Sequence, residues 1–178
     1  MALTRRASLA AMTWVRPAGA GDVAAIGRVM VRSAIDAPSG IYELAELGDD
    51  VDGLGRDVLR AARLDGHLVL LTEVGMTPVA LARVVPRDLE RSRHIAQVLV
   101  CVDPEWRGRG IGDATLRAAE RRAFHDLRVE RLELRVAADD APLLRLARRH
   151  GYRRERVERG ALVVAGAAKD LFFCVRDR

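Results

Sequence analysis

Aromatic residues are scarce in this chain, at 4% of its 178 residues, although hydrophobic residues of all types make up 49%. Aliphatic side chains must therefore fill the core, and this length suits one domain rather than two. The two cysteines, Cys101 and Cys174, form no CxxC pair and belong to no Cys/His cluster in the sequence. The usual signatures of a disulfide scaffold and of a zinc site are thus missing, so we expect no metal.

Long hydrophobic runs are also missing, because no stretch approaches the ~20 uninterrupted apolar residues that a membrane helix requires. Residues 1–12 contain two arginines and an apolar run that is too short and broken for a secretory signal. We therefore expect no membrane association and a cytoplasmic location. We also expect residues 1–12 to form a flexible tail and residues 13–178 to form a single domain.

Lysine is nearly absent: Lys169 is the only one, so arginines supply almost all the positive charge behind the net charge of +5. Acidic residues are interleaved with these arginines, as in 120–122 and 130–131. Such mixing is typical of a solvated surface rather than of a nucleic-acid-binding face. We expect no nucleic-acid partner, whereas the positive balance favours an anionic small molecule.

The hydrophobic pattern changes its period along the chain in a way that predicts one α/β domain. The predicted order is strand, helix, helix, three strands, helix, strand, helix and two strands. Gly48, Gly53 and Gly55 are expected weak points of the second helix. The run 95–102 is apolar except for Gln97, which indicates a strand in the middle of the sheet. The predicted ranges are 13–16, 22–35, 42–64, 67–74, 78–85, 95–102, 111–127, 131–136, 140–150, 152–158 and 169–176.

The most informative segment is 100–112, where a buried strand leads through a glycine-rich turn into a long helix. Alternating glycines let backbone N–H groups point into one concavity, and the helix N-terminus adds a partial positive charge. This pattern predicts a phosphate or pyrophosphate site. A P-loop would need Gly-Lys-Ser/Thr, and the dinucleotide motif GxGxxG would need glycine at position 113, which is Asp113. Both nucleotide motifs are therefore excluded.

The same turn resembles the acetyl-CoA loop of the GCN5-related N-acetyltransferase (GNAT) superfamily. The family pattern Arg/Gln-x-x-Gly-x-Gly/Ala fits 107–112 at every fixed position. The lead-in 102–106 is similar to the family's Val-x-Pro-x-Tyr/Trp, and 140–152 is similar to its Asn-x-x-Ala-x-x-Leu-Tyr-x-x-x-Gly-Phe. The end of the chain, 169–172, is similar to the closing Tyr-x-Asp strand, and the predicted element order matches from Thr13 onward.

This resemblance implies a mixed, mostly antiparallel twisted sheet flanked by helices, with splayed central strands, and acetyl-CoA as the cofactor. It implies an N-acetyltransferase whose acceptor, a small-molecule or peptide amine, attacks the thioester directly from a site near 35–47, 87–93 and 158–168. The pantetheine arm would pair with backbone in the splay, and an N–H near Val102 would stabilise the oxyanion. The residues implied in cofactor binding are Val100, Cys101, Val102, Arg107, Gly108, Arg109, Gly110, Ile111, Gly112 and Asp140.

The usual proton-transfer residues are missing from this pattern. Ala147 stands where many relatives carry a tyrosine acid, and Gln97 stands where relatives carry a glutamate base. An amide cannot accept a proton at neutral pH, so catalysis by positioning alone is one reading. Tyr152 is the replacement candidate for the acid, and the candidates for the base are His94, Glu73 and Cys101. The alternative function is a catalytically degenerate or non-catalytic acyl-CoA-binding protein.

The last predicted strand is apolar on both of its faces. We expect Leu171, Phe173 and Val175 to cover the core or a helix, which leaves Phe172 and Cys174 for another partner. Relatives of this kind often pair through their C-terminal strands, so we expect a homodimer. The alternative cover for this face is the protein's own second helix.

Overall fold

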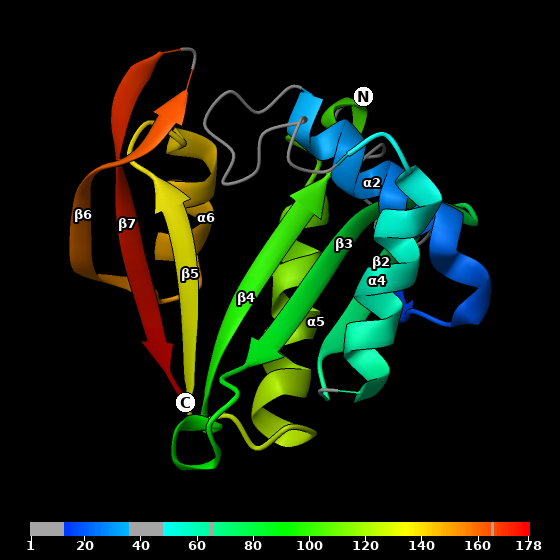
Figure 1. Cartoon of the computed structure of the whole chain (residues 1–178), viewed down its shortest axis with the longest axis horizontal. Helices are drawn as coiled ribbons and strands as arrows, with labels where there is room; N and C mark the ends of the chain where they lie inside the picture. Colours follow the sequence, from blue (N-terminus) through cyan, green and yellow to red (C-terminus); the bar gives the residue numbers. More distant parts are fainter. Residues whose placement is uncertain (1–12, 36–47, 65, 165) are drawn as a thin grey trace, which may run out of the picture.

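The computed structural model describes residues 13–35, 48–64, 66–164 and 166–178. These residues form a seven-stranded sheet in the order β1-β2-β3-β4-β5-β7-β6, with helices on both faces (Figure 1). The helices are α2 (Val23–Ile35), α4 (Val51–Leu64), α5 (Ile111–His125) and α6 (Ala141–Arg149). The strands are β1 (Thr13–Pro17), β2 (Leu68–Val74), β3 (Thr77–Pro86), β4 (Ile95–Val102), β5 (Arg131–Ala137), β6 (Arg153–Val164) and β7 (Ala167–Asp177).

The observed order of elements confirms the sequence prediction, including β4 at the centre of the sheet. The helix predicted over 42–64 is observed as α4 from Val51, and positions 42–47 lie outside the described residues. The predicted tail, 1–12, also lies outside them. The two closing strands are longer than predicted, because β6 and β7 continue their pairing up to Val164 and Ala167.

β4 and β5 form the one parallel pair among the described strands, and they pair over a short stretch only. The register runs from Ile95 opposite Arg131 to Gln97 opposite Glu133. Beyond this last pair the two strands diverge (Figure 1), although β3 stays paired with β4 and β7 with β5. The predicted mostly antiparallel sheet with splayed central strands is confirmed.

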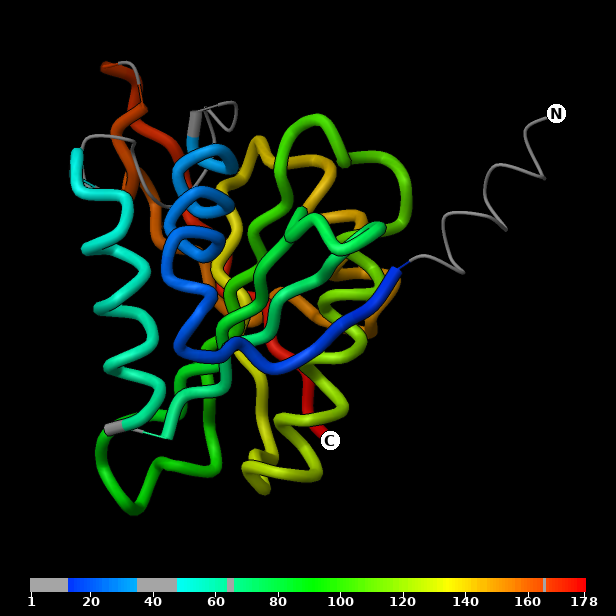
Figure 2. The backbone as a smooth tube through the Cα atoms, turned by 90° about the vertical axis from the view of Figure 1, so that its right-hand side faces the viewer, coloured from blue at the N-terminus to red at the C-terminus, as the bar shows by residue number. Residues whose placement is uncertain are grey.

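The helices divide the sheet into a rear and a front face. In Figure 1, α5 and α6 lie behind the sheet and α2 and α4 lie in front of β2 and β3; Figure 2 shows the same layers from the side. Side chains of β4 alternate accordingly: Ala96 and Val98 pack behind with α5, whereas Leu99 and Cys101 pack in front with α2. Gln97 shares the parity of Leu99 and so faces the front. No described helix is long and apolar enough to span a membrane.

The contact between α2 and α4 depends on two glycines. A Cβ atom added at Gly27 would lie 1.9 Å from the carbonyl oxygen of Val51, and one at Gly55 would lie 2.0 Å from that of Val23. Only residues without a side chain permit so close an approach of two helix backbones. Gly55, which the sequence suggested as a weak point of its helix, is therefore a packing position.

The face of β7 that we left for another partner is covered by the chain itself, and the opposite face, Leu171, Phe173 and Val175, is also buried, at 6, 8 and 1% exposure. Phe172 and Cys174 pack into the rear core with α5 and α6, whereas Phe173 and Val175 line a cavity in front. The register explains the difference: Cys174 lies opposite Leu134, which is buried behind the sheet, and cross-strand neighbours share a face. The rear core thus provides the partner that we assigned to a second subunit. The homodimer itself stays a prediction.

Candidate active site at the splayed strands

The loop after β4 is tied to the C-terminal end of α2. The Arg32 guanidinium contacts the Asp103 carboxylate at 2.5 Å and the Glu105 carboxylate at 2.9 Å. Arg107 Nη2 donates to the carbonyl oxygen of Ser33 at 2.9 Å. Burial opposes the charge of Asp103, but hydrogen bonds from Arg32 and from the Glu105 backbone hold its pKa below the ordinary value. The ion pair is therefore formed at neutral pH and fixes where the glycine turn begins.

Two glycines of the turn adopt conformations that other residues rarely adopt: φ is +72° at Gly108 and +84° at Gly110. A Cβ atom at either position would meet nothing within 4 Å, so the turn borders open space. Gly110 is the N-cap of α5, and no described side chain hydrogen-bonds to this helix end as a cap. The first N–H groups of α5 therefore lack side-chain partners. An uncapped helix end beside an open glycine turn fits a pyrophosphate group.

The third glycine and the two arginines have different roles in this turn. A Cβ atom at Gly112 would lie 3.5 Å from side-chain atoms of both α6 and β4, so the turn is packed closely there. The Arg107 guanidinium braces the loop, with Nε donating to the carbonyl oxygen of Val102 at 3.2 Å. Arg109 is exposed and stacks on Trp106 at 5.1 Å from the ring centroid. Arg109 is thus the arginine at the surface of the turn.

Alternate backbone groups of β4 face the opening between β4 and β5. The N–H of Asp103 donates to the carbonyl oxygen of Val79 at 2.9 Å, which makes these two residues a hydrogen-bonded pair of the antiparallel β3–β4 ladder. Hydrogen-bonded and non-hydrogen-bonded pairs alternate in such a ladder. The N–H groups of Val100 and Val102 therefore point toward the opening, whereas that of Cys101 points toward β3. This geometry supports Val100 and Val102 as partners of an extended ligand.

A cavity of about 830 Å³ lies on the front face of the sheet, and its lining spans β3 to β6. Gln97 and Glu133, the last register pair before the splay, both line it. Phe173 also lines it, with the guanidinium groups of Arg135 and Arg156 at 5.3 and 3.7 Å from the ring centroid. The other lining residues include Val85, Arg87, Asp88, Ile95, Arg131 and Glu155.

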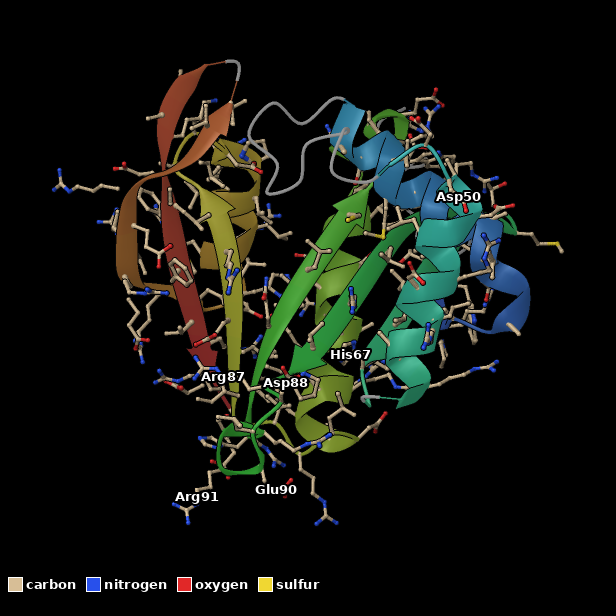
Figure 3. All side chains as sticks on the ribbon, viewed as in Figure 1. Asp50, His67, Arg87, Asp88, Glu90 and Arg91 are labelled. Atoms are coloured by element: carbon tan, nitrogen blue, oxygen red, sulfur yellow. The ribbon has the colours of Figure 1, made fainter. Side chains whose placement is uncertain are left out.

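Most charges around this cavity are paired. Arg87 Nη2 donates to Glu133 Oε1 at 2.8 Å. Figure 3 shows Arg87 at the end of the sheet where β4 and β5 meet. Glu155 contacts Arg131 at 3.1 Å. Arg135 differs, because no described acidic side chain forms an ion pair with it. Among the described residues, no group of three His, Cys, Asp or Glu side chains could hold a metal ion.

Residues 39–152 match the model of the acetyltransferase (GNAT) family. This chain belongs to that family. The matched range contains β4, the glycine turn, α5, β5 and α6, so both the turn and the splay lie inside it. The family resemblance inferred from the sequence is confirmed.

Solved GNAT structures share the fold of this chain. A protein described as an acetyltransferase from Salmonella typhimurium, solved with its cofactor acetyl-CoA, has a TM-score of 0.83 at 21% identity, covering 93% of this chain and 94% of that chain. Ribosomal-protein-alanine N-acetyltransferase from Brucella melitensis has a TM-score of 0.82 at 24% identity, covering 93% and 99%. The L-amino acid N-acetyltransferase of Escherichia coli is 30% identical over 86 residues, or 48% of this chain and 53% of that protein. The match therefore spans about half the length of this curated relative.

The GNAT fold places both Ala147 and Tyr152 in the rear core. Ala147 on α6 is 2% exposed, and Tyr152 just after this helix is 6% exposed. No described group forms a hydrogen bond with the Tyr152 hydroxyl. Burial, and then the nearby Glu120 carboxylate, raises the pKa of Tyr152 far above its ordinary value. The structure does not bring this hydroxyl together with Gln97, so it gives no support to Tyr152 as the acid.

The other candidates lie apart from Gln97 or have other contacts. His94 is exposed before β4 begins, and Glu73 on β2 is paired with an arginine of β1 at 2.7 Å. Cys101 is buried, and burial raises the pKa of its thiol. Asp140 caps α6, where its Oδ1 accepts a backbone N–H at 2.9 Å, and burial raises its pKa. Glu73, Cys101 and Asp140 therefore have structural contacts that account for them, and His94 is exposed outside β4.

Glu133 and Arg135 are cavity residues that sequence analysis did not assign to a site. The alternating pattern of 131–136 does place Glu133 on the same strand face as Arg131 and Arg135. Its position opposite Gln97 depends on the pairing of β4 with β5 across an intervening helix. The sequence does show a carboxylate on the polar face of the 131–136 strand. It does not show that this carboxylate lies opposite Gln97, because that depends on the register between β4 and β5.

Proposed function

We propose that this protein is an acetyl-CoA-dependent N-acetyltransferase. The observation that carries the proposal is the open glycine turn at Gly108 and Gly110, at the uncapped end of α5 and beside the splay. The turn suits a pyrophosphate, and the adjacent strand edge suits an extended pantetheine arm. Coenzyme A is a ligand that carries both groups, a pyrophosphate followed by a pantetheine arm.

In this proposal, the chain contributes mainly positioning. Backbone N–H groups of 108–112 and the Arg109 guanidinium hold the pyrophosphate, and the backbone of Val102, which is nearer to the turn than Val100, pairs with the pantetheine arm. Bound in this way, the cofactor supplies an activated acetyl thioester at the splay. The N–H of Val100, which also faces the opening but lies further from the turn than the expected Val102, donates to the oxygen on which negative charge develops. The cavity on the front face aligns the attacking amine with the thioester and limits the access of water.

We propose that the acceptor is a primary amine, on a small molecule or at a peptide N-terminus, that enters through the front cavity. The Escherichia coli relative is an L-amino acid N-acetyltransferase, which favours an acceptor that carries a carboxylate as well as an amine. Arg135 supports this choice, because it lines the cavity and no described acidic side chain is paired with it. A guanidinium in that state can bind a carboxylate through two parallel hydrogen bonds.

Calorimetry with acetyl-CoA tests the cofactor assignment, and the variant Gly110→Asp should abolish binding. The aspartate strains a backbone with φ of +84° and places negative charge at the pyrophosphate. Gly166→Asp is the matched control, because Gly166 also has a positive φ of +78° and open space around its Cβ position, but lies between β6 and β7. Wild-type protein that binds no acetyl-CoA at near-millimolar concentration contradicts the proposal. A folded Gly110→Asp variant that binds normally contradicts the role of the turn.

The second candidate is a catalytically degenerate or non-catalytic acyl-CoA-binding protein. Gln97 and Ala147 favour it, because neither side chain can transfer a proton. A thiol-release assay with acetyl-CoA and a panel of amines, amino acids, aminoglycosides and peptides separates the two functions. Robust turnover of any acceptor excludes this candidate, whereas binding without turnover supports it.

A further inference from the structure

The front cavity contains a carboxylate at the point where β4 and β5 separate. We propose that Glu133 is the catalytic base, which accepts the proton that the acceptor amine loses, while Gln97 occupies the position of the usual base on β4. This inference rests on the proposed acetyltransferase function. It assigns this role to β5, because β4 has no carboxylate or imidazole side chain and burial raises the pKa of its one thiol, Cys101.

The register places Glu133 where a base is needed. It lies directly opposite Gln97 in the last pair before the strands diverge. Its neighbours Leu132 and Leu134 are buried in the rear core, so Glu133 projects to the front, and both Gln97 and Glu133 line the same cavity. The opening that would admit the thioester from behind begins immediately beyond this pair. Val100, whose N–H faces this opening, lies three residues beyond Gln97, or about 10 Å along β4. An amine between the cavity and the splay can therefore pass its proton to the Glu133 carboxylate through an ordered water.

The Glu133 carboxylate is held in place but is not fully occupied. Its side chain is 20% exposed, and Oε1 accepts one hydrogen bond from Arg87 at 2.8 Å. No described group donates to Oε2, which leaves this oxygen for a ligand. Arg87 is 49% exposed, so it orients the carboxylate from the solvent side without enclosing it.

The other two carboxylates of the cavity are less suited to this role. Asp88 is exposed in the loop that follows β3. Glu155 is exposed on β6, the edge strand, and is paired with both Arg131 and Arg153, at 3.1 and 3.0 Å. Two strands separate β6 from β4, so Glu155 lies away from the splay. Among the described residues that line the cavity, Glu133 is thus the carboxylate next to the expected reaction centre.

The proton balance of the reaction gives Glu133 a defined task. An ammonium and the acetyl thioester yield an amide, a thiol and one released proton. A C–N bond forms, and the C–S bond breaks with its electron pair leaving on sulfur. Of the two protons that nitrogen loses, Glu133 accepts one and passes it to solvent, and the other is taken up by sulfur through water. The ionised carboxylate also attracts the ammonium before reaction, which favours its entry into the cavity.

The isosteric variant Glu133→Gln tests this role with the amino acid that wild-type enzyme acetylates fastest. We expect kcat/KM to fall at least 100-fold, the lower bound for loss of a general base, with acetyl-CoA binding by calorimetry unchanged. Asp126→Asn is the control, because it also neutralises a carboxylate paired with an arginine, Arg122 at 2.7 Å, but does not line the cavity; it should change kcat/KM by less than about threefold. The double variant Gln97→Glu/Glu133→Gln returns a carboxylate to the same register pair and should recover at least tenfold over Glu133→Gln.

A binding measurement that needs no turnover gives a second readout. With CoA in place of acetyl-CoA, the amine should bind Glu133→Gln at least fivefold more weakly than wild type, because the charge-assisted contact is lost. Wild-type protein without acetyl-CoA binding or turnover contradicts the proposed function itself. Wild-type activity together with a Glu133→Gln variant that keeps more than one third of kcat/KM contradicts Glu133 as the base. An Asp126→Asn variant that loses as much activity as Glu133→Gln also overturns the assignment.

Discussion

Replacing Gly55 by alanine has two opposite effects on the stability of the fold, a gain in helix propensity and a steric clash between α2 and α4. The packing of the two helices decides which effect is larger. Alanine is a better helix former than glycine by about 1 kcal/mol in a helix interior, so propensity alone predicts a more stable protein. The new Cβ atom, however, would lie 2.0 Å from the carbonyl oxygen of Val23 and 2.8 Å from its carbonyl carbon. Both atoms belong to the backbone, so rotation of a side chain cannot relieve the contact.

The size of the required movement sets the magnitude. An ordinary C···O contact is about 3.3 Å, so α2 and α4 must separate by about 1.3 Å from the 2.0 Å approach. A gap of that size forfeits much of the dispersion energy between the helices, and overpacking costs about 3 kcal/mol at the upper end of the usual range. Subtracting the gain in propensity leaves a net loss of about 2 kcal/mol. For a chain of this length, the melting temperature should fall by roughly 4–8 °C.

Urea unfolding followed by circular dichroism measures this loss, with Gly53→Ala as the control in the same helix. The atoms nearest to a Cβ at Gly53 belong to the exposed side chain of Asp50, and the two that lie closer than 3.0 Å are in its carboxylate, which can rotate away. We expect this control to stay within about 1 kcal/mol of wild type, the usual cost of disturbing a cap. A Gly55→Ala variant that is as stable as wild type would show that the close helix contact does not exist in solution.

Two further predictions concern buried groups of the site. Tyr152→Phe should change kcat for thiol release by less than about threefold, because the hydroxyl is buried without a partner and burial raises its pKa; a tenfold loss would return Tyr152 to the catalytic residues. The pKa of Asp103 is lowered in the folded state, mainly by Arg32 against the effect of burial, so this pair stabilises the fold above the unfolded pKa of about 3.9 and loses its effect as pH falls through the folded pKa. Arg32→Ala should therefore reduce the difference in urea stability between pH 7 and pH 3, and an unchanged difference would contradict this assignment.

The cofactor side of the site could be predicted from the sequence because its signals are local. Gly108, Gly110 and the start of α5 are adjacent in the chain, and their conformations follow from residue type and helix geometry. The same holds for Gly151, whose φ of +79° ends α6 as expected. Backbone orientation required the structure, because the sequence could not show that the N–H of Cys101 faces β3 whereas those of Val100 and Val102 face the opening.

The acceptor side could not be predicted in the same way, because its residues meet through pairing between distant strands. The sequence shows that Phe172 and Phe173 lie on opposite faces, but only the register with β5 shows which of them faces the rear core. Gly55 is a similar case, because a glycine in a helix reads as a weak point until the neighbouring helix is in place. The local sequence pattern thus predicts which residues share a face of a strand or helix. Tertiary packing decides which of the faces is turned toward the core, which is the phase of the pattern.

That dependence on phase explains how Glu133 on β5, the base that we propose, lies opposite Gln97 on β4. The side chains of a strand alternate with a period of two, so shifting β5 by one residue against β4 would turn every one of them to the other face. Leu132 and Leu134, at 0% and 2% exposure, are fixed by the rear core and make such a shift costly. The packing that buries these leucines therefore also holds Glu133 in front, opposite Gln97. A glutamate at either position of this pair would face the same cavity, so exchanging the two residues tests Glu133 as the base without changing the core.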